Sequence, residues 1–123
     1  MTDSTALVRE LYEAYQRRDW HGAASLLHPD ATLDMPATRE RLTGREQVIE
    51  FQRSYPEPWG DLSVRRVLGG ADEACAEVEI VGSEQTFRLA AFWRAEGELL
   101  RDGIEYWVTV GGEEPPIGRA PTY

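Results

Sequence analysis

Two acidic side chains lie within a long run of strand-forming residues late in the chain. Asp102 and Glu105 belong to residues 99–109, whose other members are mostly apolar or aromatic. Successive side chains of a strand point to opposite faces, so an acid on the concave face of a curved sheet would lie in a partly dry cavity. Burial there would raise its pKa, as proton transfer near neutral pH requires. Asp102 and Glu105 are therefore the candidate catalytic acids or bases.

Gly103 separates the two acids and leaves two arrangements open. A glycine within a strand often marks a bulge, which changes the faces on which the following side chains lie. In a regular strand, Asp102 shares one face with Tyr106, and Glu105 shares the other with Trp107. With a bulge at Gly103, Asp102, Glu105 and Trp107 can all face the same way.

The composition limits the partners of the protein. A net charge of -9 disfavours nucleic acids and anionic membranes, which bind clustered cations. Every cation is arginine, so a lysine Schiff base is excluded. The single cysteine, Cys75, and the lack of a signal or membrane-spanning run predict a cytoplasmic protein. His21 and His28 do not have the spacing of metal ligands, and we expect neither a metal nor a cofactor.

The elements that would position these residues follow from hydrophobic periodicity. Spacings of three and four predict helices over residues 5–18 and 20–27, with Asp3 or Ser4 capping the first and Asp19 the second. Residues 31–35 alternate as a short strand, and residues 37–42 are interpreted as a polar loop. Thr43 and Glu46 have the spacing of a capping box that opens a third helix. A period of two then predicts an antiparallel meander of four strands, over residues 61–68, 75–81, 86–94 and 99–110.

The length of 123 residues fits one domain. We therefore expect a single unit over residues 1–123, in which residues 111–123 form an irregular arm rich in proline.

Several short motifs add a resemblance. They are Tyr12-Glu13-Ala14-Tyr15, Arg18-Asp19-Trp20, His28-Pro29-Asp30-Ala31-Thr32, Gly44-Arg45-Glu46 and Glu105-Tyr106-Trp107. With the order of the elements, they resemble the SnoaL-like branch of the nuclear-transport-factor-2-like superfamily, from about residue 6 to residue 110. The resemblance implies an α+β cone, with three N-terminal helices packed on a strongly curved antiparallel or mixed sheet. It also implies a dimer through sheet faces.

The family includes isomerases, cyclases, dehydratases, epoxide hydrolases and non-catalytic binding proteins, so the fold does not specify a reaction. The positions at which ketosteroid isomerases carry a tyrosine, a base aspartate and a protonated aspartate hold Leu11, Met35 and a residue near Ala90. That set of functional groups is missing, which disfavours the ketosteroid isomerase reaction.

Two further catalytic patterns are also incomplete. The histidine–aspartate dyad of polyketide cyclases falls near Phe92 and near Tyr106 or Trp107. Limonene-type epoxide hydrolases use an asparagine, which this chain lacks, so only Arg94 and Asp102 could join a partial set.

We therefore expect a cavity for a small hydrophobic or aromatic molecule. Its expected contacts are Tyr12, Tyr15, Trp20, Met35, Phe51, Tyr55, Trp59, Phe92, Arg94 and Trp107. If the protein is an enzyme, Asp102 or Glu105 would move a proton in an isomerisation, cyclisation or dehydration, with Tyr15 or Tyr55 as a hydrogen-bond donor. The alternative is a non-catalytic ligand-binding or dimerisation module, and either protein is expected to be a homodimer.

Overall fold

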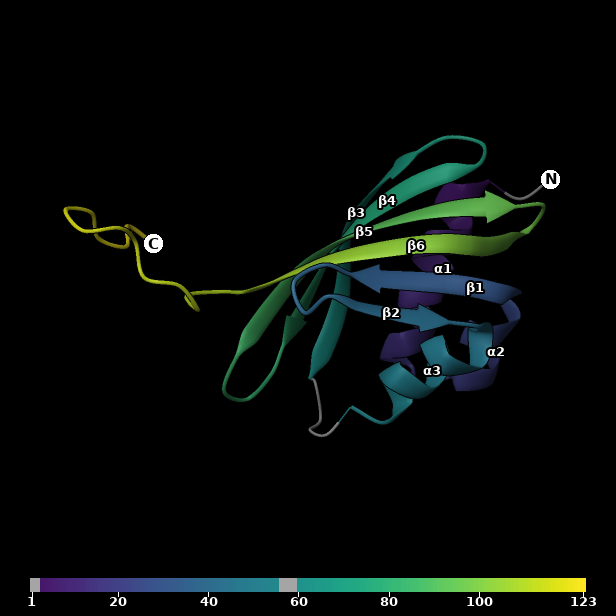
Figure 1. The fold of residues 1–123 in the computed structure, drawn as a ribbon, viewed down its shortest axis with the longest axis horizontal. Helices are drawn as coiled ribbons and strands as arrows, with labels where there is room; N and C mark the ends of the chain where they lie inside the picture. The colour runs from purple at the N-terminus through teal and green to yellow at the C-terminus, as the bar shows by residue number, and fades with distance from the viewer. Residues whose placement is uncertain (1–2, 56–59) are drawn as a thin grey trace.

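Within residues 3–55 and 60–123, which the computed structural model describes, helices cover one face of a six-stranded sheet (Figure 1). The elements in chain order are α1 (Ser4–Gln16), α2 (Trp20–Ser25), β1 (Leu27–Met35), β2 (Glu40–Thr43), α3 (Arg45–Arg53), β3 (Asp61–Gly69), β4 (Glu73–Val81), β5 (Thr86–Glu96) and β6 (Leu99–Thr109). The strand order is β2-β1-β6-β5-β4-β3, and every pair is antiparallel except β1 with β6. The expected α+β cone with a mixed sheet is confirmed.

The first two helices form where the periodicity predicts them, but both end earlier. The Asp3 side chain accepts a hydrogen bond from the Thr5 amide and caps α1, which ends at Gln16. Asp19 caps α2 through the Gly22 amide, as expected. The apolar stripe of α1 is buried and lies against β3 and β4, so it closes the concave side of the sheet.

β1 begins four residues before the predicted strand. Leu27 pairs with Leu100, Thr32 pairs with Asp102, and the register between β1 and β6 shifts between these pairs. Pro29 lies within this irregular part, where its missing amide hydrogen breaks no regular ladder. The proline that suggested a later start is therefore accommodated inside the strand.

The interpretation of residues 37–42 as a loop holds for residues 37–39, which form a turn, but is wrong for residues 40–42, and the predicted capping box is also wrong. Glu40–Thr43 forms β2, which pairs with β1 at the sheet edge, and its charged side chains suit an edge strand. Because Thr43 belongs to this ladder, α3 is capped by Gly44 without a side-chain hydrogen bond. Gln47, rather than Glu46, reaches back and accepts a hydrogen bond from the Thr43 amide.

The remaining strands form the predicted antiparallel meander, with small changes at their ends. Their inward side chains form the core with α1, and the largest is Trp93. No helix in the described part of the chain is long and apolar enough to cross a membrane.

Candidate functional site

Glu105 is the one acidic side chain among the described residues that is buried in the core. β6 alternates regularly past Gly103, so Glu105 and Trp107 face inward while Asp102 and Tyr106 face outward. The register shift with β5 lies between the pairs Arg94–Asp102 and Ala95–Leu100, and so precedes Gly103. Of the two open arrangements, the structure has the regular strand.

Gly103 allows a large side chain to pack closely against β6 and does not form a bulge. It lies directly opposite Trp93 on β5, and a Cβ at this position would lie 2.6 Å from carbons of the indole ring. The glycine therefore makes room for the Trp93 ring to lie across β6, and that ring is only 2% exposed.

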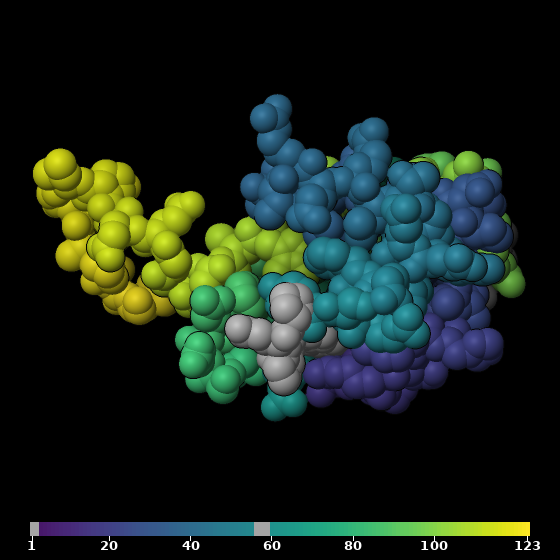
Figure 2. Space-filling view, turned by 60° about the horizontal axis from the view of Figure 1, so that its bottom comes forward, coloured from purple at the N-terminus to yellow at the C-terminus, as the bar shows by residue number. Residues whose placement is uncertain are grey.

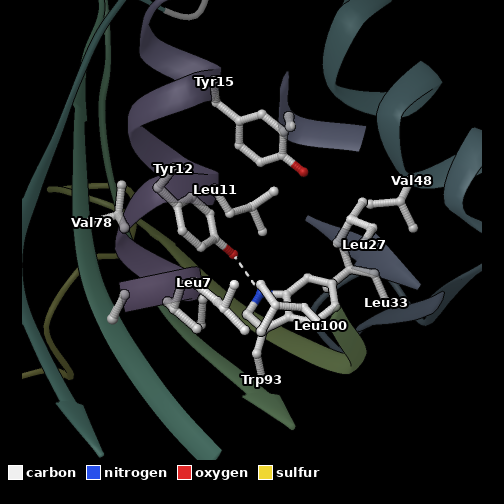
Figure 3. Close-up of a cluster of buried hydrophobic side chains, with 14 of the residues drawn as sticks. Leu7, Leu11, Tyr12, Tyr15, Leu27, Leu33, Val48, Val78, Trp93 and Leu100 are labelled. Carbon is white, nitrogen blue, oxygen red and sulfur yellow. Dashed lines mark hydrogen bonds between the residues drawn. The ribbon is translucent and has the colours of Figure 1, made fainter. Parts of the chain in front are cut away.

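Two hydrogen bonds join Glu105 to its neighbours, and a third joins one of these neighbours to Trp93. The Tyr12 hydroxyl donates to Oε2 of Glu105 at 2.6 Å, and Nε1 of Trp107 donates to Oε1 at 2.9 Å. Nε1 of Trp93 donates to the Tyr12 hydroxyl at 3.1 Å, and Figure 3 shows these two side chains pointing toward one another from β5 and α1. We call Glu105, Tyr12, Trp93 and Trp107 the acid network.

The hydrogen bonds of the acid network suit an ionised carboxylate, because both bonds to Glu105 are donated by its neighbours, one to each carboxylate oxygen. Burial nevertheless raises the pKa of Glu105, and the hydrogen bonds from Tyr12 and Trp107 only partly oppose this effect. Burial and hydrogen bonding thus shift the pKa of Glu105 in opposite directions, as is typical of a group that takes up and releases a proton.

The second buried tyrosine on α1 has a free hydroxyl. The Tyr15 ring meets the Tyr12 ring edge to face, with centroids 5.5 Å apart, and also contacts Trp20. No hydrogen bond joins the Tyr15 hydroxyl to the residues that the structure describes, although the side chain is only 1% exposed. In Figure 3 this hydroxyl points away from Tyr12, toward the side of Val48. Burial and the charge of Glu105 raise the pKa of Tyr15 well above its usual value, so it stays a donor.

A pocket of about 340 Å³ opens in front of Trp107. Its lining residues are Met35, Ala37, Thr38, Glu40, Phe51, Tyr55, Phe87, Trp107 and Thr109. We call it the mouth pocket. Phe87 meets Trp107 edge to face at 5.9 Å, so aromatic rings form one wall. Since the same Trp107 donates to Glu105, its indole connects the mouth pocket to the acid network.

A wider groove of about 780 Å³ lies between α2 and α3. Charged side chains of both signs line it, and one of its arginines, Arg53, already pairs with Glu50. No member of the acid network lines it, so it offers little to a hydrophobic molecule. No group of three or more potential metal ligands occurs among the residues described.

The structure divides the expected cavity residues into two sets. Tyr12, Tyr15, Trp20, Met35, Phe51, Tyr55 and Trp107 lie in the interior or around the mouth pocket. Asp102, Phe92 and Arg94 lie on the opposite side of the sheet, contrary to expectation, and Asp102 forms an exposed ion pair with Arg94. Trp59 lies outside the described residues.

The sequence patterns did not predict Trp93 and Phe87 as residues of the site. Both faces of β5 carry apolar residues around Phe92, so alternation alone does not tell which face is inward. The available signal was Gly103, because a glycine opposite a large ring in an adjacent strand admits close packing.

The comparisons with known proteins agree with this architecture. Residues 8–103 match the family model described as the SnoaL-like domain. No curated protein sequence matches the chain.

Among solved structures, a Kribbella flavida DSM 17836 protein, provisionally described as a ketosteroid isomerase, is 28% identical, with a TM-score of 0.85 over 97% of this chain and 90% of that one. A Catenulispora acidiphila DSM 44928 protein of ketosteroid isomerase-like fold, in complex with trimethylamine, is 18% identical, with a TM-score of 0.69 over 81% and 83%. An M. tuberculosis epoxide hydrolase resembling limonene epoxide hydrolase is 13% identical, with a TM-score of 0.70 over 85% and 82%. The last two similarities concern the fold.

Proposed function

The chain belongs to the SnoaL-like domain family, and we propose that it binds a small hydrophobic or aromatic molecule in the mouth pocket. The observation that carries the proposal is the aromatic wall formed by Phe87 and Trp107, with the indole held in place by Glu105. A preformed concave surface with few polar groups suits such a ligand. Tyr55, which is partly exposed at the rim, supplies a hydroxyl for orientation.

Two matched substitutions on β5 test this proposal. Phe87 lines the mouth pocket, whereas Phe92 lies on the opposite side of the same strand. Binding of 2-naphthol, a neutral aromatic probe, is measured by titration calorimetry. Phe87→Ala should weaken binding by about tenfold or more, because the lost apolar contact amounts to at least about 1.4 kcal/mol. Phe92→Ala should leave the Kd within about twofold. Equal losses in the two variants would place the ligand elsewhere.

Acid–base catalysis is the second candidate, favoured by the raised pKa of Glu105 and the unused hydroxyl of Tyr15. Trp107 separates Glu105 from the mouth pocket, so the indole must turn aside before a ligand can reach Oε1. That movement removes a hydrogen bond that lowers the pKa of Glu105, and so makes the carboxylate a stronger base. Glu105 would then take a proton from a carbon next to a carbonyl, and the hydroxyl of Tyr15, or that of Tyr55 in the lining of the mouth pocket, would donate to the developing oxyanion.

The exchange of carbon-bound hydrogen tests this second candidate. In heavy water, NMR follows the loss of the α-protons of 2-tetralone, an aromatic ketone. The wild type should accelerate the exchange, and Glu105→Gln should abolish the acceleration while the ketone still binds. Acceleration that persists in Glu105→Gln would exclude Glu105 as the base.

We further infer that the protein is a cytoplasmic homodimer. Large apolar side chains are exposed on the side of the sheet that the helices leave uncovered. We call this side the outer face, and its apolar members are Leu68, Cys75, Phe92, Ile104, Tyr106, Val108 and Val110. A patch of this kind supports association with another protein surface. The single free cysteine suits a reducing compartment.

A further inference from the structure

The final 13 residues leave the body of the molecule. Residues 111–123 follow β6 without forming a helix or strand, and both views show this arm standing clear of the sheet (Figures 1 and 2). Its backbone hydrogen bonds are local, from Gly112 to Thr109 and from Arg119 to Pro116. Ile117 and Tyr123 are fully exposed. Exposing apolar side chains to water is unfavourable, so burying Ile117 and Tyr123 against another surface would lower the free energy.

The outer face offers that surface, and it continues into the arm. Leu68, Cys75, Phe92 and Ile104 lie opposite one another in register across four strands. Tyr106, Val108 and Val110 then extend the apolar surface along β6 to the residue at which the arm begins. The rings of Phe92 and Tyr106 meet edge to face, with centroids 6.1 Å apart, and join the two parts of this surface.

The charges of the outer face allow a second copy to approach. The chain as a whole carries a net charge of -9, which would make two copies repel. On this face, however, three carboxylates are paired with arginines: the pairs are Arg66–Glu77, Arg88–Glu79 and Arg94–Asp102. These pairs reduce the repulsion between two outer faces, and the arginines of one copy can face the carboxylates of the other across a two-fold axis.

The geometry of the arm favours a neighbouring molecule over its own sheet. The arm leaves along the direction of β6 (Figure 1), Pro115 and Pro116 restrict its backbone, and a turn closed by the hydrogen bond from Arg119 to Pro116 follows near its far end. Fully extended, 13 residues reach roughly 40 Å, and the 11 residues of β6 span roughly 36 Å. An arm can thus run along the outer face of a second copy.

The arm is also part of what this chain shares with a solved structure. The similarity to the Kribbella flavida protein covers 97% of the 123 residues, so at most about four residues lie outside it. Most of residues 111–123 therefore fall within the matched region.

We propose that residues 111–123 are exchanged between two copies of this chain, each arm packing Ile117 and Tyr123 against the outer face of the other copy. This inference rests on the proposed homodimer and specifies how it is held together. In this dimer the two outer faces and the two arms bury one another, and the interface is isologous.

Sedimentation velocity over a range of concentrations tests the exchange on the full chain. The test variant combines Ile117→Ser with Tyr123→Ser, and Thr122→Ser is the matched control in the same arm. Both test residues are fully exposed in the single chain, so the fold, checked by circular dichroism, should be unchanged. The dimer Kd should rise by at least about 100-fold in the test variant, because two apolar side chains are lost from each arm. It should stay within about twofold in the control.

Each other outcome has a definite meaning. A wild type that is monomeric at every concentration overturns both the homodimer and the exchanged arm. A dimer with the same Kd in wild type and test variant overturns the arm but leaves the homodimer. Trypsin, which cleaves after Arg119, gives an independent measurement: cleavage in the arm should slow as dimer forms, and a rate that is independent of dimer content would contradict exchange.

Discussion

Replacing Glu105 by glutamine should remove a pH-dependent part of the free energy of unfolding. Burial raises the pKa of folded Glu105 above its ordinary value of 4.5. Between those two pKa values, the folded protein keeps a proton that the unfolded chain has released. The contribution of Glu105 to stability is therefore complete below about pH 4.5 and is lost as the pH rises through the folded pKa.

The expected size follows from one proton. For each pH unit between the two pKa values, the free energy of unfolding should fall by about 1.4 kcal/mol because of this group. Other carboxyls act in the opposite sense: the hydrogen bond from Arg41 lowers the pKa of Asp34, and those from Ser54 and Arg53 lower the pKa of Glu50, so the stability they supply is lost as the pH falls. These groups are the same in wild type and Glu105→Gln, so the difference between the two proteins isolates Glu105.

The measurement is urea unfolding followed by tryptophan fluorescence, from about pH 4 to about pH 8. The stability of the wild type relative to Glu105→Gln should decrease as the pH rises. In Tyr12→Phe the acid loses a hydrogen bond that lowers its pKa, so the decrease relative to Tyr12→Phe/Glu105→Gln should extend to higher pH. A constant difference, or one that increases with pH, would refute the reasoning, because the hydrogen bonds would then outweigh burial.

Two further predictions concern the same strands. Gly103→Ala should lower the free energy of unfolding by roughly 1–3 kcal/mol, because the new methyl group would overlap the Trp93 ring. Gly70→Ala, where the added methyl group meets nothing within 4 Å, is the control for the same urea experiment. Asp102→Asn should change stability by less than about 1 kcal/mol and leave 2-naphthol binding unaltered, because Asp102 pairs with Arg94 in water. Weakened binding in that variant would return Asp102 to the candidate site.

The sequence alone was sufficient for the elements whose signals are local. The spacing of Leu7, Leu11 and Tyr15 places α1, because a helix brings side chains three and four apart onto one face. The turns and alternation after residue 60 place the meander. The short motifs led to the family, and the strand with Asp102 and Glu105 was correctly chosen as the one that carries a buried acid.

Long-range pairing decided the rest. β2 has no apolar alternation and is a strand only because β1 offers it an edge. The register of β5 with β6 decides on which side of the sheet Phe92 and Asp102 lie. A shift of one residue would move each side chain to the opposite side.

Glu105 shows most clearly which properties come from the sequence and which come from the tertiary structure. Its type and its place on a late strand are properties of the sequence. Its partners come from α1 and β6, and Tyr12 is 93 residues away along the chain. No local pattern encodes that contact, because only packing of the helix across the concave sheet brings the hydroxyl to the carboxylate. Burial and hydrogen bonding of one acid, which together set its proton affinity, are therefore products of the tertiary structure.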